Sequence, residues 1–73
     1  MPMNQINPRK LLRSKWTAVS PINKEKHFII TDIEFDEEGV VIHCEIEAVM
    51  SKRTQLIDWR QLKEQDVWLQ GWK

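Results

Sequence analysis

The stretch HFIITDIEFDEEGVVIHCEIEAVM, residues 27–50, decides the fold. Its second half alternates strictly, because the apolar set Val40, Ile42, Cys44, Ile46, Ala48 and Met50 is separated by single residues. Alternation with a period of two is typical of a strand with one buried face. Residues 29–35 repeat the pattern, and the acidic segment between the two runs ends in Gly39. A four-residue loop that ends in glycine favours a type I turn, so the stretch predicts a β-hairpin.

The turn and the alternation together predict a register. If Phe35 pairs with Val40, the following pairs on the same face are Ile33–Ile42, Thr31–Cys44 and Ile29–Ile46. The same register places His43 opposite Asp32 and His27 opposite Ala48. A shift by one residue would turn each of these side chains to the other face of the sheet.

The flanking segments predict further short elements. Asn7-Pro8 begins a helical turn, residues 15–20 form a strand that Pro21 ends, and residues 22–26 form a charged connector. Residues 51–53 form a basic turn, residues 54–59 supply a strand with Leu56 or Ile57 inward, and Asp58 caps a helical turn over residues 59–63. A final strand places Trp68 and Trp72 on one side.

These elements predict a mainly β fold. We expect a small antiparallel sheet or SH3-like barrel of about five short strands, with one short helical turn before the last strand. A three-stranded sheet covered by a longer C-terminal helix is the alternative. We expect residues 1–8 to be a flexible leader, with residues 1–6 disordered, and residues 9–73 to form a single small Trp-rich domain.

Composition excludes several classes of protein. The 11 basic and 11 acidic residues give no net charge that would attract nucleic acid or an anionic membrane. No segment has the length of a transmembrane helix or the apolar core of a secretory signal. The single cysteine cannot form an internal disulfide, which favours a reducing cytoplasm.

Tryptophan and its neighbours form a recurrent pattern along the chain. The motifs are Lys15-Trp16-Thr17-Ala18-Val19, Lys26-His27-Phe28, Cys44-Glu45-Ile46-Glu47-Ala48-Val49, Lys52-Arg53, Asp58-Trp59-Arg60-Gln61-Leu62 and Trp68-Leu69-Gln70-Gly71-Trp72. In this order they resemble the small tryptophan-rich bacterial proteins classed as a domain of unknown function. The resemblance extends over residues 9–72. It implies a shared sequence pattern but no activity, so it supplies no catalytic residues.

The residues that could carry chemistry do not converge. His43 and Cys44 are adjacent on a strand and point to opposite faces, and the predicted register separates His27 from Cys44 by about 14 Å along the strand. We therefore expect no metal site, no cofactor and no catalysis, with Cys44 packed as a structural thiol. The pair of His43 and Asp32 is expected to be a cross-strand polar contact, with no nucleophile beside it.

The indoles are the candidate binding residues. We expect any single indole to belong to the core, but a domain this small has difficulty burying four tryptophans, and an exposed indole beside an arginine would form a stacking surface. The predicted surface for a protein or peptide partner comprises Trp16, Arg53, Trp59, Arg60, Trp68 and Trp72. The alternative is a nucleic-acid surface of Arg9, Lys10, Arg13 and Lys15, next to Trp16. We expect a monomer or a weak dimer that does not bind membranes.

Overall fold

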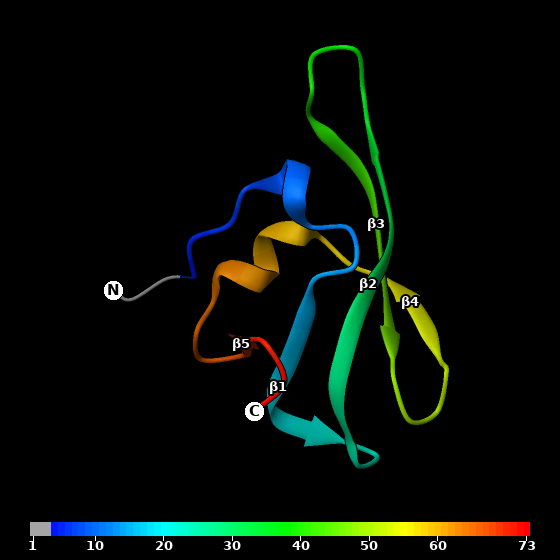
Figure 1. Cartoon of the computed structure of the whole chain (residues 1–73), viewed down its shortest axis with the longest axis vertical. Coiled ribbons are helices and arrows are strands. Elements are labelled where there is room, and N and C mark those ends of the chain that lie inside the picture. Colours follow the sequence, from blue (N-terminus) through cyan, green and yellow to red (C-terminus); the bar gives the residue numbers. More distant parts are fainter. Residues whose placement is uncertain (1–3) are drawn as a thin grey trace.

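The computed structural model describes residues 4–73, which form one five-stranded antiparallel sheet and two short 3₁₀ turns (Figure 1). The elements are η1 (Pro8–Lys10), β1 (Lys15–Ile22), β2 (Glu25–Phe35), β3 (Val41–Ala48), β4 (Thr54–Leu56), η2 (Trp59–Lys63) and β5 (Trp68–Gln70). The strand order is β4-β3-β2-β1-β5. The predicted mainly β fold is confirmed, and the sheet is open, not a closed barrel. The alternative with a longer C-terminal helix does not form.

The long hairpin forms between β2 and β3, with a register that differs from the predicted one. Phe28 pairs with Ala48 and Ile30 with Ile46, whereas Ile33 pairs with Cys44. The count shifts between these pairs because β2 contains one extra residue at Thr31, and it shifts again near the tip. Such a β-bulge places two residues of one strand opposite one residue of its partner. The predicted pairs Ile29–Ile46, His27–Ala48 and Phe35–Val40 are wrong by one residue, and the predicted pairs Thr31–Cys44 and Ile33–Ile42 are wrong by two.

The bulge decides which side chains of the hairpin are buried. Before it, Phe28 and Ile30 face the core, and after it Ile33 packs against the same core. On β3 the predicted alternation is confirmed for Cys44, Ile46 and Ala48. It fails toward both ends, where Val40, Ile42 and Met50 are exposed. Among residues 4–73 no second layer covers these positions, because the molecule is thin, at 37 × 31 × 15 Å.

The tip of this hairpin follows the predicted turn. Gly39 has a φ of +84°, and its N–H donates to the carbonyl of Asp36. The Asp36 carboxylate accepts hydrogen bonds from the backbone N–H groups of Glu38 and Val40. We call residues 31–43 the arm, because this part of the hairpin extends beyond the rest of the sheet, toward the top of Figure 1.

The connection between β1 and β2 is tighter than predicted. Pro21 does not end β1, which continues to Ile22 and pairs there with Glu25. Only Asn23 and Lys24 lie between the paired residues, and both have positive φ, at 56° and 62°. Two consecutive left-handed residues are typical of a type I′ turn. The predicted connector over residues 22–26 is therefore a two-residue hairpin turn.

The N-terminal segment is packed against the domain from Asn4 onward. The buried Asn4 side chain donates hydrogen bonds to the carbonyls of Leu62 and Trp68, at 2.7 and 2.8 Å. Its backbone N–H donates to the carbonyl of Lys63. Asn7 then caps η1 through its side chain, as predicted. The prediction of a disordered start therefore differs from the structure at residues 4–6, while residues 1–3 lie outside the described part of the chain.

The C-terminal third matches the predicted elements closely. Asp58 caps η2 through the backbone N–H of Arg60, and of the two residues proposed to face inward, Ile57 packs against the core while Leu56 is exposed. The buried apolar cluster comprises Leu11, Trp16, Phe28, Ile30, Cys44, Ile46, Ala48, Leu62 and Trp68. No helix in the described part of the chain is long and apolar enough to cross a membrane.

Candidate functional site

Two of the four indoles belong to the core. Trp16 is 2% exposed, and its Nε1–H donates to the Ser14 hydroxyl at 2.8 Å. Trp68 is 8% exposed and meets Phe28 edge to face, with ring centroids 5.0 Å apart. An indole with so little accessible surface offers a partner almost no contact area. We therefore leave Trp16 out of any proposed surface, and Trp68 can contribute only the edge of its ring.

Trp72 is the exposed indole, at 44% exposure. Its Nε1–H donates to the Phe28 carbonyl at 3.0 Å, its ring lies against His27, and the Lys15 Nζ sits 4.7 Å from the ring centroid. Gly71, with a φ of +81°, turns the chain at this point. The Thr17 hydroxyl donates to the Gly71 carbonyl and accepts from the Lys73 N–H. Trp72 therefore clamps the C-terminal residues onto β1 and β2.

The basic cluster of the alternative prediction lacks its predicted aromatic partner. Arg9, Lys10, Arg13 and Lys15 are all exposed. Their sequence neighbour Trp16 is buried, however, so it cannot stack with a base. Lys15 instead covers Trp72, which brings one member of this cluster to the only strongly exposed indole in residues 4–73.

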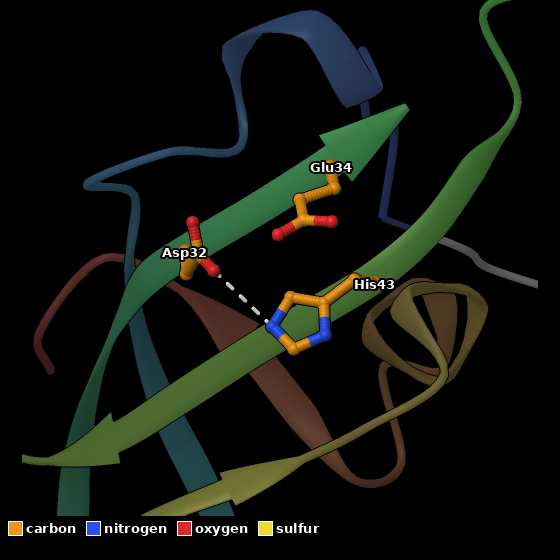
Figure 2. Close-up of side chains that lie close together, drawn as sticks. All are labelled: Asp32, Glu34 and His43. Atoms are coloured by element: carbon orange, nitrogen blue, oxygen red, sulfur yellow. Dashed lines mark ion pairs between the residues drawn. The ribbon is translucent and has the colours of Figure 1, made fainter. Parts of the chain in front are cut away.

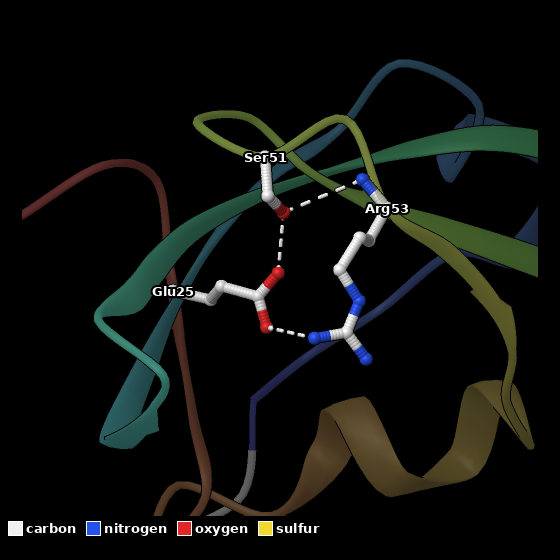
Figure 3. Close-up of polar contacts among 3 residues, drawn as sticks. All are labelled: Glu25, Ser51 and Arg53. Carbon is white, nitrogen blue, oxygen red and sulfur yellow. Dashed lines mark hydrogen bonds and ion pairs between the residues drawn. The ribbon is translucent and has the colours of Figure 1, made fainter.

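Arg53 lies in the connection between β3 and β4, at the end of the sheet away from the arm (Figure 1). Its guanidinium lies 3.4 Å from a carboxylate oxygen of Glu25, and the Ser51 hydroxyl donates to the other oxygen of the same carboxylate (Figure 3). These contacts connect the start of β2 to the turn between β3 and β4. Arg53 and Trp68 also border a cavity of about 380 Å³ whose floor includes Phe28. The structure thus brings together two of the predicted site residues that are far apart in sequence.

Trp59 and Arg60 line a different and larger cavity. It has a volume of about 470 Å³ and is lined by residues 39–44 of the hairpin, by residues 57–60 and by Pro8. We call it the β3-edge groove. Its volume lies within the range of roughly 300–1,000 Å³ that is common for ligand sites. The six predicted surface residues therefore do not form one surface but separate into the core, the Trp72 clamp, the Arg53 cavity and the β3-edge groove.

The side chains at one wall of the groove are held by neighbouring groups. Arg60 donates to both carboxylate oxygens of Asp58, at 3.1 and 3.0 Å. These hydrogen bonds lower the pKa of the Asp58 carboxyl group and raise the pKa of the Arg60 guanidinium. Lys63 lies 4.8 Å from the centre of the half-buried Trp59 ring. Trp59 and Arg60, which both line the groove, are therefore each in contact with a charged neighbour.

Cys44 is one of the residues that line the groove, although it is 3% exposed. Burial raises the pKa of its thiol to about 11, and the negative charges of Asp32 and Asp58 add to this effect. A thiol with this pKa is almost entirely protonated near neutral pH, and a protonated thiol is a poor nucleophile and a poor metal ligand. This protonation state supports the structural role expected for Cys44.

His43 contacts Asp32 as expected, although the two are not ladder partners. The Nε2 atom of His43 lies 3.2 Å from the Asp32 carboxylate, whereas the residue directly opposite His43 is Glu34. The sequence interpretation missed Glu34, because the structure pairs Phe35 with Val41 and then shifts the register once more near the tip, which places Glu34 opposite His43. It also missed the free edge of β3. The sequence did carry a signal for that edge. The predicted strand after the basic turn, residues 54–59, is shorter than residues 40–50, so it leaves part of the longer strand unpaired.

Comparison with known proteins identifies a family. Residues 14–73 match the family model described as Tryptophan-rich protein (DUF2389). No curated protein and no solved structure matches the chain. The match extends over most of the chain and agrees with the tryptophan pattern of the sequence. The chain therefore belongs to the tryptophan-rich protein family DUF2389, a family of unknown function.

Proposed function

We propose that this chain is a non-enzymatic binding module that takes up an extended peptide segment of a partner protein along the free edge of β3. The observation that carries the proposal is the position of the β3-edge groove beside a strand that is only partly paired. β3 has eight residues, whereas β4 has three and pairs only with Glu45, Ile46 and Glu47. Within residues 4–73, the first three residues of β3, Val41, Ile42 and His43, have no strand partner on the β4 side.

Backbone geometry supports strand addition at this edge. The carbonyl of Cys44 accepts a hydrogen bond from the N–H of Ile57, so the backbone groups of Cys44 point toward the β4 side. In an antiparallel strand, the backbone groups of every second residue point to the same edge. Ile42, two residues before Cys44, is the extra residue of β3 between the pairs Glu34–His43 and Phe35–Val41, so it has no ladder partner on β2. A peptide that pairs there would continue the line of β4, and its main-chain hydrogen bonds would supply affinity.

The side chains around the edge define the kind of peptide. Exposed Val40 and Ile42 lie on one wall, and Trp59 with Ile57 lies on the other. These groups would pack against alternate apolar side chains of an extended segment. Trp and Arg are also the residue types that most often dominate binding energy at interfaces, and Trp59 and Arg60 are adjacent here.

Charge favours a neutral or basic segment over a polyanion. Asp58 and Arg60 largely neutralise each other, and the groove ends at Gly39, directly beside the acidic residues Asp36, Glu37 and Glu38. Arg9 is the basic group near this end. A phosphate backbone would be repelled by the three carboxylates. The proposal is therefore a peptide site. A cytoplasmic location, which the buried lone thiol favours, is part of the same proposal.

A peptide library displayed on phage tests the proposed function. The library is selected only for binding to the wild-type protein, and the enriched peptides are then measured for binding to Ile42→Lys, which places a charge at the free edge without disturbing a buried residue. Leu56→Lys is the matched control, because Leu56 is 67% exposed and Ile42 63%, and Leu56 lies outside the groove. Circular dichroism is used to check that both variants are folded.

We expect enriched peptides with alternating apolar residues that bind the wild type and Leu56→Lys equally and bind Ile42→Lys at least about tenfold more weakly, the equivalent of about 1.4 kcal/mol. Failure to enrich any peptide, or enrichment of peptides that bind Ile42→Lys as well as the wild type, would refute the proposal. Binding of a labelled oligothymidylate that weakens with salt, together with no peptide binding, would favour the nucleic-acid alternative instead.

A further inference from the structure

Three ligand-bearing side chains meet on the arm, on two neighbouring strands. Asp32 and Glu34 project from β2, and His43 projects from β3 between them (Figure 2). Each offers one ligand atom, and these atoms all lie within 4.8 Å of one another. Glu34 and His43 are direct ladder partners, and Asp32 lies two residues before Glu34 on β2, so the backbone of the sheet fixes their spacing.

We propose that Asp32, Glu34 and His43 bind a divalent transition-metal ion of the zinc class. The imidazole distinguishes this cluster from an ordinary acidic surface, because histidine nitrogen together with carboxylate oxygen is a donor set that suits zinc and its neighbours, whereas calcium and magnesium prefer oxygen alone. Bound ligand atoms sit about 2.0–2.2 Å from zinc, so small side-chain rotations would bring the three atoms into place.

The charges of the arm favour a bound cation. Within residues 4–73, no Lys or Arg nitrogen lies within 4.0 Å of the Asp32 or Glu34 carboxylate, and the Asp32 carboxylate contacts the His43 ring at 3.2 Å. Directly opposite Asp32 lies a third carboxylate, Glu45, which accepts a hydrogen bond from Thr31. Two carboxylates and a neutral imidazole would balance the charge of a divalent ion.

The site is accessible from solvent and would leave coordination positions free. The side chains of Asp32 and His43 are 51% and 29% exposed, so an ion can enter without opening the fold. Three protein ligands leave at least one position for water or for a donor group of a partner molecule. The metal site does not depend on the proposed peptide function, because its three ligands are side chains on the arm and require no bound peptide.

Zinc binding to the full chain is measured by isothermal titration calorimetry, with Co²⁺ absorption as a second readout. The test variants are His43→Ala and Glu34→Gln, and the matched controls are His27→Ala and Glu47→Gln, which remove the same donor types elsewhere on the sheet. We expect saturable binding of one zinc ion by the wild type and by both controls. Each test variant should bind at least about tenfold more weakly, since even indirect partners of a metal site contribute 10–100-fold.

The Co²⁺ spectrum separates this site from binding at the thiol. Ligation by nitrogen and oxygen predicts weak visible bands without the strong near-ultraviolet absorption of a metal–thiolate bond, which Cys44 would produce. The absence of saturable zinc binding, a thiolate band, or equal affinity of wild type, His43→Ala and Glu34→Gln would each overturn the proposal. Loss of binding in His27→Ala with retention in His43→Ala would overturn it as well.

Discussion

The buried Asn4 side chain gives the most direct prediction about stability. Asn4 is 7% exposed, and its amide joins the carbonyl of Leu62 in η2 to that of Trp68 in β5. Replacing it with Ala removes both hydrogen bonds and leaves two carbonyls without a partner. A net contribution of about 0.5–1.5 kcal/mol per hydrogen bond gives a loss of about 1–3 kcal/mol in the free energy of unfolding.

That loss is large for a chain of 73 residues, whose expected total stability is about 4–11 kcal/mol. Urea denaturation followed by circular dichroism measures it, and the slope with urea should stay unchanged because the fold is retained. Gln5→Ala is the control, because the Gln5 side chain is exposed and only its backbone carbonyl is bonded, to Gln70; we expect a change below about 0.5 kcal/mol. If Asn4→Ala were as stable as the wild type, the N-terminal segment would not be packed as described.

Three further predictions follow from burial and backbone geometry. Ile46→Asp should prevent folding, because Ile46 is fully buried opposite Ile30, and a folded variant by circular dichroism would contradict the observed register. Lys24→Gly should raise the free energy of unfolding by about 1 kcal/mol in urea denaturation, since Lys24 has a φ of 62°, and a destabilised variant would contradict the type I′ turn. The raised pKa of Cys44 predicts that stability falls as pH rises from 9.0 to about 11, because the unfolded thiol releases its proton first; the loss reaches about 2–3 kcal/mol and should be absent in Cys44→Ala measured over the same pH range.

The sequence predicted the elements well because each has a local signal. Alternation identified β3, the final glycine identified the arm turn, and Asp58 identified the start of η2. The predicted register was wrong already at the tip, where Phe35 pairs with Val41 and not with Val40, and two irregularities along the hairpin then shift the pairing without changing the local composition. Thr31 fits an alternating pattern and gives no sign that it is the extra residue.

The candidate site was harder to predict because exposure depends on tertiary packing. Trp16, Trp59 and Trp72 each have a charged residue next to them in the sequence, yet they lie respectively in the core, at the groove and at the surface. Trp16 lies in the paired part of β1, Trp59 begins η2, and Trp72 follows the end of β5. Glu34 escaped notice for a related reason, since only the shifted register places it opposite His43.

The most direct test of the proposed peptide site is an NMR measurement of the contacts between the bound peptide and the backbone of β3. A peptide selected as described above is added to isotope-labelled protein, and intermolecular backbone contacts and amide exchange are recorded. Strand addition predicts contacts between the peptide backbone and residues 41–43, with slowed exchange of the Ile42 amide. Peptide contacts confined to Trp72 or to the edge of β5, with the exchange of Ile42 unchanged, would contradict a peptide site at the edge of β3.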